Sequence, residues 1–259
     1  MVLPCTKRKG SIVGNNDLKI TAYTSVKERK MAARYYKHNG KDLPSVTTIT
    51  GQLDKAGLTY WAANCAADYI LDELEKLKSD RAVIMLDDIL PIVEKSRKEF
   101  TKVSAKALDI GSAVHATIER YLKTREEPQE PSSEIWSAFI GFLSFLDRWK
   151  SWETIMTEHT MYADRFAGTC DWITMLNSNK YIVDFKTYNE NASKKPPYEE
   201  HKCQTAAYRS MDDTVVGNGA LYLGKKTGKV LWFDFSNTYE HDLKVFQALT
   251  DLWHTRKEK

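Results

Sequence analysis

Residues 166–187, which read FAGTCDWITMLNSNKYIVDFKT, predict the fold of the central part of the chain. Two short runs rich in β-branched and aromatic residues, 169–176 and 181–185, flank the turn-forming tripeptide NSN at 177–179. Apolar runs of this length on either side of a short polar turn are typical of a β-hairpin. The hairpin is therefore the reference point from which the rest of the sequence is interpreted.

Acidic residues and a lysine occupy this hairpin. Side chains alternate between the two faces of a strand, so Asp184 and Lys186 are expected to share a face with Ile182. Asp171 lies in the first strand, at a position that can sit across from the second. Two carboxylates with a neighbouring ammonium predict a divalent-cation site beside a positioned lysine.

The apolar periods on either side predict an α/β protein of the α+β kind. Helices are expected at 59–78, 82–95, 96–123, 134–150 and 198–210 and at the C-terminus, and strands at 154–162, 169–176, 181–187, 215–223 and 229–235. Ser96 and Glu99 form a capping-box pattern for the third helix. This order predicts a mixed sheet flanked by helices and preceded by an N-terminal helical region.

Composition narrows the class of protein. The chain has 259 residues, 42% hydrophobic and 28% charged, with a formal net charge of +3, so any basic surface must be local. No apolar run reaches membrane-spanning length, and no membrane partner is expected. The cysteines are widely scattered, which favours a reducing cytoplasm (the host cytoplasm if the chain is phage-encoded). They are Cys5, Cys65, Cys170 and Cys203.

A short N-terminal stretch mixes cations with tyrosines. Its members are Lys27, Arg29, Lys30, Arg34, Tyr35, Tyr36 and Lys37. Such a surface can stack bases and meet phosphates. A solvated strand pair that packs its tyrosines is an equally good reading. Asn39-Gly40 predicts a tight turn directly after it.

The ordered motifs resemble the PD-(D/E)XK nuclease superfamily, in which an acidic residue, a hairpin and Asp-x-Lys follow one another. The segment GTCD at 168–171, followed by DFKT at 184–187, looks like its RecB-type branch. GSAVH at 111–115 matches that branch's G-x-x-x-H helix, and Gln204 with Tyr208 matches its Q-x-x-x-Y helix. A lone D-x-K means little, whereas four elements in family order are specific.

A further short phrase, LPSVT at 43–47, predicts a helix start. It is similar to a segment found early in some RecB-type exonucleases, including mitochondrial genome-maintenance exonucleases and related phage enzymes. The resemblance implies a restriction-endonuclease-like fold, with residues 101–259 as the nuclease core. Residues 1–100 would then hold N-terminal strands and a helical lid or arch.

The resemblance also implies a set of metal ligands: His115, Asp171, Asp184 and the backbone carbonyl of Phe185, with Glu119 acting on a second ion or through its water. Oxygen ligands suit Mg²⁺ or Mn²⁺, and an added imidazole favours Mn²⁺. Some RecB-type nucleases hold an iron–sulfur cluster through cysteines clustered after these motifs. No cysteine follows Cys203, so no iron–sulfur cluster is expected.

The catalytic residues implied by the resemblance are Lys186, Asp184, Asp171 and Glu119. Lys186 would orient a water or offset charge in the transition state. Gln204, Tyr208 and Thr187 are implied as substrate-binding residues. Gln204 and Tyr208, four apart on one helix face, could hold either the attacked strand or Lys186.

The expected function is metal-dependent hydrolysis of DNA by an exonuclease, on single strands or free ends, in replication, repair or recombination. Replication or recombination proteins are possible partners. A structure-specific endonuclease or a phage-type duplex exonuclease is the alternative within enzymes. Two further alternatives are a nucleic-acid-binding module on an inactive nuclease scaffold and a small-molecule metal-dependent hydrolase. Taken singly, each site residue also has an ordinary reading, such as a surface ion pair between Asp184 and Lys186 or a packing role for His115.

Overall fold

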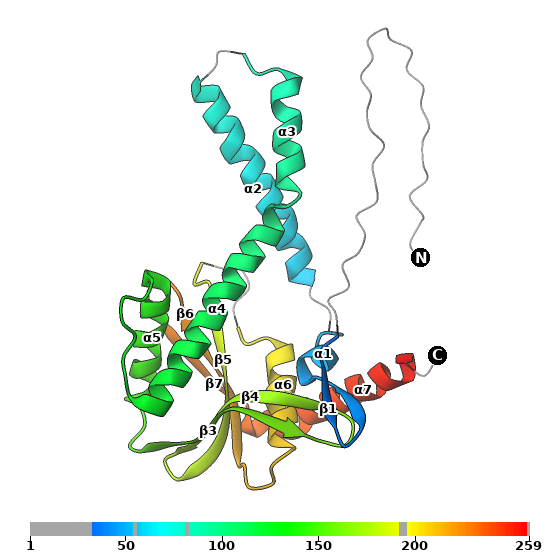
Figure 1. Cartoon of the computed structure of the whole chain (residues 1–259), viewed down its shortest axis with the longest axis vertical. Coiled ribbons are helices and arrows are strands. Elements are labelled where there is room, and N and C mark those ends of the chain that lie inside the picture. The colour runs from blue at the N-terminus through cyan, green and yellow to red at the C-terminus, as the bar shows by residue number, and fades with distance from the viewer. Residues whose placement is uncertain (1–32, 54–55, 81–82, 192–195, 258–259) are drawn as a thin grey trace. The chain divides into compact units, whose positions relative to one another are not determined.

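A five-stranded mixed sheet forms the centre of the chain (Figure 1). Its strands are β3 (Trp152–Tyr162), β4 (Ala167–Leu176), β5 (Asn179–Tyr188), β6 (Gly217–Gly224) and β7 (Val230–Asp234). They lie in the order β3-β4-β5-β6-β7, and only β5 and β6 run parallel. The expected mixed sheet is confirmed. The structure is a computed structural model that describes residues 33–53, 56–80, 83–191 and 196–257.

Helices flank this sheet and precede it. They are α1 (Val46–Thr50), α2 (Ala56–Asp80), α3 (Leu86–Ser96), α4 (Glu99–Thr124), α5 (Ser133–Leu146), α6 (Glu199–Arg209) and α7 (Tyr239–Lys257), with a short 3₁₀ turn, η1 (Ser236–Thr238). Parallel strands need a crossover connection, and α6 lies in the one that joins β5 to β6. The predicted helices and strands are therefore confirmed, with ends that differ by a few residues.

The hairpin predicted from the central stretch is formed by β4 and β5. Its two-residue turn holds Asn177 at φ 47° and Ser178 at φ 68°. Positive φ at both positions is the geometry of the turn type that matches the twist of paired strands. The register places Leu176 opposite Asn179.

The two faces of the sheet build two separate cores. Trp172, Val183 and Phe185 point to the face covered by α4 and α5. Ile173 and Ile182 point to the other face, where α1, α6 and α7 pack. Because β5 alternates regularly, Asp184 and Lys186 share the face of Ile182, as expected.

Strand β4 departs from this alternation beside the predicted metal site. Cys170 belongs to the core on the α6 side, whereas Trp172, two residues later, belongs to the core on the α4 side. Residues two apart in a regular strand share a face, so the strand is irregular at Asp171. This irregularity determines where the Asp171 carboxylate points.

Helices α2 and α3 pack on each other and on α4. The Trp61 and Phe100 rings meet edge to face at 5.1 Å, joining α2 to α4. The capping-box prediction is wrong: the Ser96 hydroxyl donates to the Val93 carbonyl at 2.8 Å, and the residue before α4 is Lys98, which makes no side-chain cap. Ser96 is the last residue of α3, and its hydroxyl bonds within that helix.

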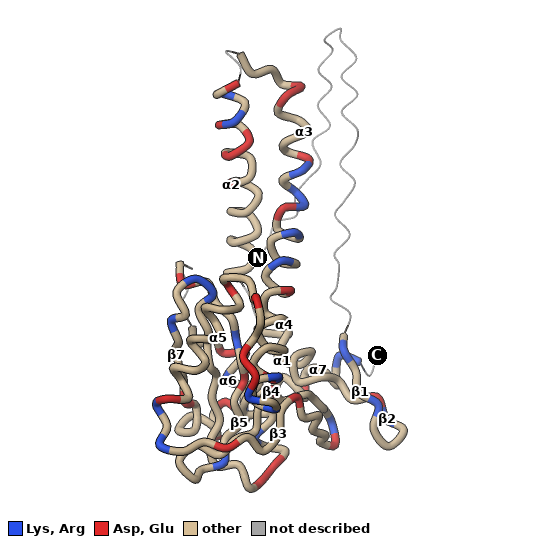
Figure 2. The backbone as a smooth tube through the Cα atoms, turned by 60° about the vertical axis from the view of Figure 1, so that its left-hand side comes forward, with Lys and Arg blue, Asp and Glu red and all other residues tan. Residues whose placement is uncertain are grey.

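Residues 33–259 cluster as one unit, and α4 ties the preceding helices to the sheet. It contacts α2 and α3 as well as strands β3 and β5. The predicted boundary near residue 100 thus falls at the start of a helix that spans both regions. Acidic residues outnumber basic ones along α2 and α3, and the charges of α2 lie in its later turns (Figure 2).

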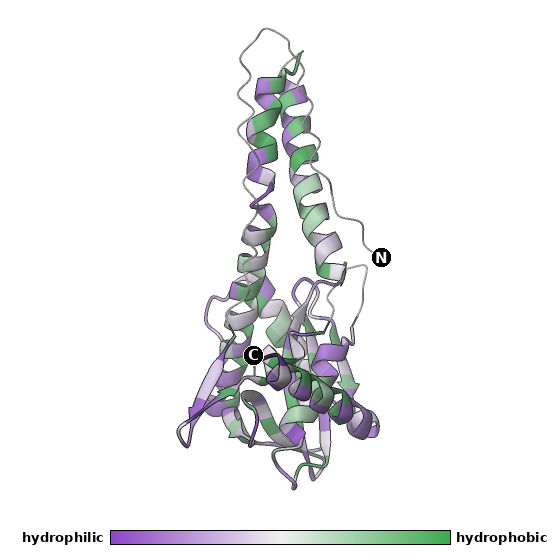
Figure 3. Cartoon of the chain, turned by 90° about the vertical axis from the view of Figure 1, so that its right-hand side faces the viewer, coloured by the Kyte–Doolittle hydropathy of each residue, from purple (hydrophilic) through white to green (hydrophobic). Residues whose placement is uncertain are grey.

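Several large apolar side chains on these helices remain exposed, and α2 and α3 carry visible apolar stretches (Figure 3). The exposed residues on α2, α3 and α4 include Leu58, Tyr60, Trp61, Leu71, Leu86, Leu90, Val103 and Leu108. None of the helices in the described ranges combines the length and apolar character needed to cross a membrane.

A small hairpin of β1 (Tyr35–His38) and β2 (Lys41–Pro44) precedes α1. Its predicted tight turn is confirmed, with Asn39 at φ 47° and Gly40 at φ 75°. The predicted helix start is confirmed as well, since the Ser45 side chain accepts from the Thr48 N–H at 3.0 Å.

The hairpin also carries part of the predicted cation–tyrosine stretch. The Arg34 guanidinium lies 4.9 Å from the centre of the Tyr36 ring. Lys27, Arg29, Lys30 and Cys5 lie outside the described residues. The three cysteines within them, Cys65, Cys170 and Cys203, are free thiols.

Gly168, the first residue of the G-x-x-D motif, has a steric reason to be glycine. A Cβ there would lie 2.6 Å from Tyr208 Cε1 and 3.1 Å from Val46 Cγ2. We expect Gly168→Ala to lower the free energy of unfolding by about 1–3 kcal/mol, the usual cost of overpacking a core. Thermal unfolding checks this. Gly57→Ala is the control, because a Cβ at Gly57 meets nothing within 4 Å. Equal stability of the two variants would contradict the packing argument.

Candidate active site

Asp184 is a buried carboxylate on the central strand β5, with only 1% of its surface exposed. Its Oδ2 contacts the ammonium of Lys186. Within the described residues, its Oδ1 is buried without a hydrogen-bond partner. A buried carboxylate oxygen without a partner is unfavourable, and a cation is one group that would satisfy it. The pair differs from the surface ion pair considered from the sequence, because the Asp184 side chain is buried and that of Lys186 is 22% exposed.

Lys186 remains charged in this environment. Burial opposes its ammonium form, but the charges of Asp184 and Asp171 raise the pKa of Lys186 above its ordinary value. Glu200, in the first turn of α6, adds a smaller effect of the same sign. The lysine is thus an ammonium held against the acidic cluster, and it is suited to stabilise negative charge rather than to accept a proton.

Asp171 reaches the same place from β4. Its Oδ2 accepts the Phe185 N–H at 2.7 Å and lies 3.6 Å from His115 Nδ1. Burial, followed by the charge of Asp184, raises the pKa of Asp171 well above its usual range. Lys186 and the Phe185 N–H oppose this shift but do not cancel it. Two close carboxylates cannot both ionise easily without a cation.

His115 approaches the cluster from α4, on the opposite face of the sheet from α6. Its ring meets the Phe185 ring edge to face at 5.9 Å and hydrogen-bonds the Phe185 backbone. Burial and then the Lys186 charge lower the pKa of His115. A neutral imidazole is the form that binds a metal ion.

Glu158, on β3, completes the cluster and was not identified from the sequence. Ligand atoms of His115, Glu158 and Asp171 lie within 4.8 Å of one another. The register pairs Thr157 with Trp172 and His159 with Cys170, which puts Glu158 across from Asp171. An acidic residue in the predicted strand 154–162 was the available signal.

Its backbone is unusual, with Glu158 at φ 47° inside a strand. Such left-handed conformations of non-glycine residues are unfavourable and gather at functional sites. Burial and then the charge of Glu119 raise the pKa of Glu158, while Lys123 and Arg34 oppose the shift. Glu158 therefore combines an unfavourable backbone conformation with a position beside other acidic residues.

Glu119 lies at the edge of the site rather than within the group of close ligand atoms. It is one turn after His115 on α4 and pairs with Lys123 at 2.5 Å. Its effect on Glu158 shows that it is near enough to act on the cluster electrostatically.

Gln204 and Tyr208 lie on α6, behind the acidic residues. They are 7% and 2% exposed and are joined by a side-chain hydrogen bond. Burial and then the charge of Asp184 raise the pKa of Tyr208 well above its usual range. Their burial favours a supporting role beneath Asp184 and Gly168 over direct contact with a substrate strand.

Thr187 is partly buried and lies beside the G-x-x-x-H helix. A Cβ built on Gly111 would lie 3.4 Å from Thr187 Oγ1, an ordinary contact distance. The two motifs thus meet where α4 crosses β5.

A second polar group adjoins Lys186. His201 Nδ1 lies 2.6 Å from the Tyr222 hydroxyl, and Tyr222 sits beside Lys186 in the parallel pairing. Burial lowers the pKa of His201; a hydrogen bond that His201 donates to Glu200 opposes the shift, and the charge of Lys186 adds to it. These residues support Lys186 from α6 and β6.

Comparisons with known proteins give little further information. No family profile matches the chain, and no curated protein matches it. Among solved structures, the crystal structure of SSO0001 matches 54% of this chain and 72% of its own, with 15% sequence identity and a TM-score of 0.28. A TM-score this low carries no argument about function.

The raised pKa of Asp171 predicts how the metal-free protein responds to pH. The folded protein binds this proton more tightly than the unfolded chain, so the stabilisation is complete below about pH 4 and is lost as the pH rises through the folded-state pKa. Asp171→Asn keeps an acceptor for the Phe185 N–H and removes the charge. Chemical unfolding in a chelator should show the variant gaining stability over wild type as the pH rises. Exposed Asp109→Asn is the control; a variant less stable at every pH would contradict this.

The cluster also predicts a cation affinity that depends on named residues. His115→Ala and Glu158→Gln should each weaken Mn²⁺ binding by at least about tenfold, measured by calorimetric titration. Mn²⁺ should bind more tightly than Mg²⁺ because an imidazole is among the ligands. Glu153→Gln, an exposed position on the same strand, should bind as wild type does. A folded His115→Ala protein with unchanged affinity would leave only the packing role for His115.

Proposed function

We propose that this protein is a metal-dependent deoxyribonuclease that hydrolyses phosphodiester bonds, acting on single strands or free ends. One observation carries the proposal: Asp184 is buried with an unpartnered oxygen beside Asp171, against the Lys186 ammonium. That combination suits a cation and a phosphate together, because the acidic residues hold the cation and the lysine attracts the phosphate.

The donor set fits Mg²⁺ or Mn²⁺. The close ligand atoms are carboxylate oxygens of Asp171 and Glu158, which hard divalent ions prefer, and a nitrogen of the His115 imidazole. The unpartnered oxygen of Asp184 lies outside that group of three and is proposed as a further ligand. The Phe185 backbone borders the same position through its hydrogen bond to His115. A bound ion of this kind supplies Lewis-acid polarisation of the scissile phosphodiester.

The remaining chemistry falls to the chain's own residues. Lys186, held as an ammonium, donates hydrogen bonds toward a non-bridging phosphate oxygen or the attacking water and stabilises the charge of the transition state. Glu200, His201 and Tyr222 keep the lysine in place from α6 and β6. Gln204 and Tyr208 support Asp184 from beneath.

Restriction to free ends is the part of the proposal that rests on α2 and α3. These helices contact the start of α4, whose later turns carry His115 and Glu119. Helices in this position can limit access by continuous strands, which favours an exonuclease over an endonuclease.

Cleavage assays on labelled DNA test the proposal. Lys186→Ala and Asp184→Asn should each lower the cleavage rate by at least about a hundredfold, the scale of losing one electrostatic contact to the transition state. Both variants should stay folded, because each removes a polar group rather than core volume. Lys180→Ala is the matched control: it sits on the same strand and pairs with Asp212 at 2.7 Å, away from the cluster.

The choice of substrates separates the alternatives. A linear single strand should be degraded much faster than a covalently closed circular one; equal rates would favour an endonuclease. DNA that is bound without being cut, with Mg²⁺ or Mn²⁺ present, would indicate a binding module. Wild-type cleavage rates in both site variants would remove the assignment altogether.

A further inference from the structure

A groove of about 490 Å³ opens beside the acidic cluster, between the last turn of α4 and strand β3. Lys123 and Arg125 form its helical wall, and Thr154, Thr157 and Glu158 lie along its strand wall. The cation site described above gives most of these groove residues no role. The position and the charges of the groove suggest what it binds.

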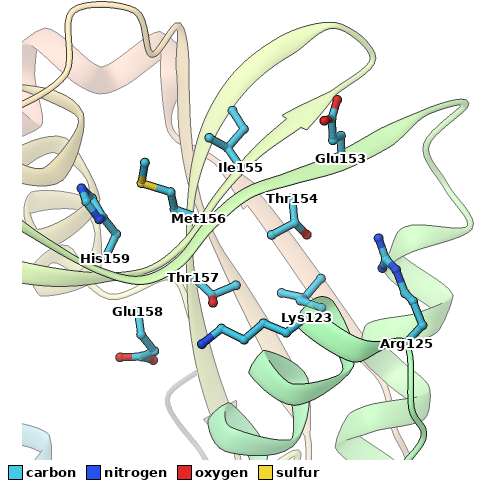
Figure 4. A pocket seen from close by; sticks show the side chains of 10 residues that line it. Lys123, Arg125, Glu153, Thr154, Ile155, Met156, Thr157, Glu158 and His159 are labelled. Atoms are coloured by element: carbon cyan, nitrogen blue, oxygen red, sulfur yellow. The ribbon is translucent and has the colours of Figure 1, made fainter.

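The groove is continuous with the cluster, because Glu158 belongs to both. Figure 4 shows Thr154, Thr157 and Glu158 on the side of the strand that faces Lys123, while Glu153 and Ile155 point to the other side. Glu158, whose side chain faces the helical wall, is thus also a member of the acidic cluster. The opposite end of the groove leads to Arg125.

Arg125 is a fixed cation with unused donors. It ends α4 in a left-handed conformation, at φ 63°. Its guanidinium lies 4.2 Å from the centre of the Trp152 ring and 5.8 Å from that of Tyr121. Stacking on an indole holds the guanidinium plane and leaves its N–H edge open. In the part of the chain that the structure describes, no carboxylate lies within ion-pair distance of Arg125.

Unlike Arg125, Lys123 has an ion-pair partner, because its ammonium lies 2.5 Å from Glu119. Its charge still acts along the groove and opposes the raised pKa of Glu158. The wall therefore offers one shared ammonium near the cluster and one open guanidinium farther away. On the strand wall, the Thr154 hydroxyl accepts from the Trp172 indole N–H at 3.1 Å and the Thr157 hydroxyl oxygen is buried, so the two cations are the groups that face a ligand.

We propose that this groove holds the sugar–phosphate backbone of the nucleic-acid strand next to the phosphate being cut, with Arg125 as its main phosphate contact. The inference rests on the proposed function and deepens it. A guanidinium with a fixed plane and an open edge fits a phosphate oxygen pair. Cations that contact phosphates bind a strand through its backbone and so without regard to base sequence.

Equilibrium binding of a fluorescent 20-nucleotide oligothymidine tests the inference. The full chain carries Asp184→Asn so that the strand is not cut, and the added change is Arg125→Gln. We expect the dissociation constant to rise about tenfold, and the slope of log affinity against log salt to become shallower by about 0.7, the value for one lost single-strand phosphate contact.

The matched control is Arg120→Gln, which removes the same charge from the same helix. Arg120 pairs with Glu126 at 2.6 Å and does not line the groove, so this variant should bind as its parent does. Arg125→Lys keeps the charge and should retain part of the affinity. Thermal unfolding of each variant verifies that Arg125→Gln is folded.

The outcomes separate the two proposals. A parent protein that binds the strand while Arg125→Gln matches it in affinity and salt slope would overturn the groove inference and leave the proposed function standing. Equal weakening by Arg120→Gln and Arg125→Gln would also overturn it, because the effect would then be one of net charge. A parent that binds no DNA at all would overturn both.

Discussion

Burial of a carboxyl group on the central strand of a sheet is the constraint on which the rest of this structure depends. Asp184 sits between two hydrophobic neighbours, Val183 and Phe185, that fill the core on the α4 side. One of its oxygens meets Lys186, and the other is left without a partner in the described residues. The neighbouring carboxyl group of Asp171 is affected as well: its burial, and then the charge of Asp184, raise the pKa of Asp171.

The layered arrangement of the fold lets opposite faces of one sheet contribute to a single site. Phe185 points toward α4 and brings His115 over the strand, while Asp184 and Lys186 point toward α6. Irregular backbone at Asp171 and Glu158 then turns two further carboxylates to the same point. The regular part of the sheet therefore holds the site rigid, and its two irregular residues direct their carboxylates toward His115.

Much of this could be predicted from the sequence, because periodicity and turn chemistry are local. The alternation around Asp184 and the turn at Asn177 and Ser178 follow from residue types alone. Glu158 could not be found in the same way, because its place in the site depends on a left-handed backbone that breaks the two-residue period. Ser96 shows a related limit, since a hydroxyl next to a helix start can equally bond within the preceding helix.

Burial was the other property that the sequence did not reveal. Gln204 and Tyr208 were expected at the substrate, yet α6 packs against β5 and β6 and encloses them. Tyr208 packs against Gly168, and its hydrogen bond to Gln204 keeps both side chains within the packed layer beneath the site.

The central claim is that the cluster around Asp184 exists to hold a divalent cation. Anomalous diffraction from crystals of the wild-type protein soaked in Mn²⁺ tests this most directly. The account predicts a strong manganese peak within about 2–2.5 Å of a ligand atom of His115, Glu158, Asp171 and Asp184. A well-ordered site without any peak there, at a concentration that populates manganese elsewhere on the molecule, would contradict it.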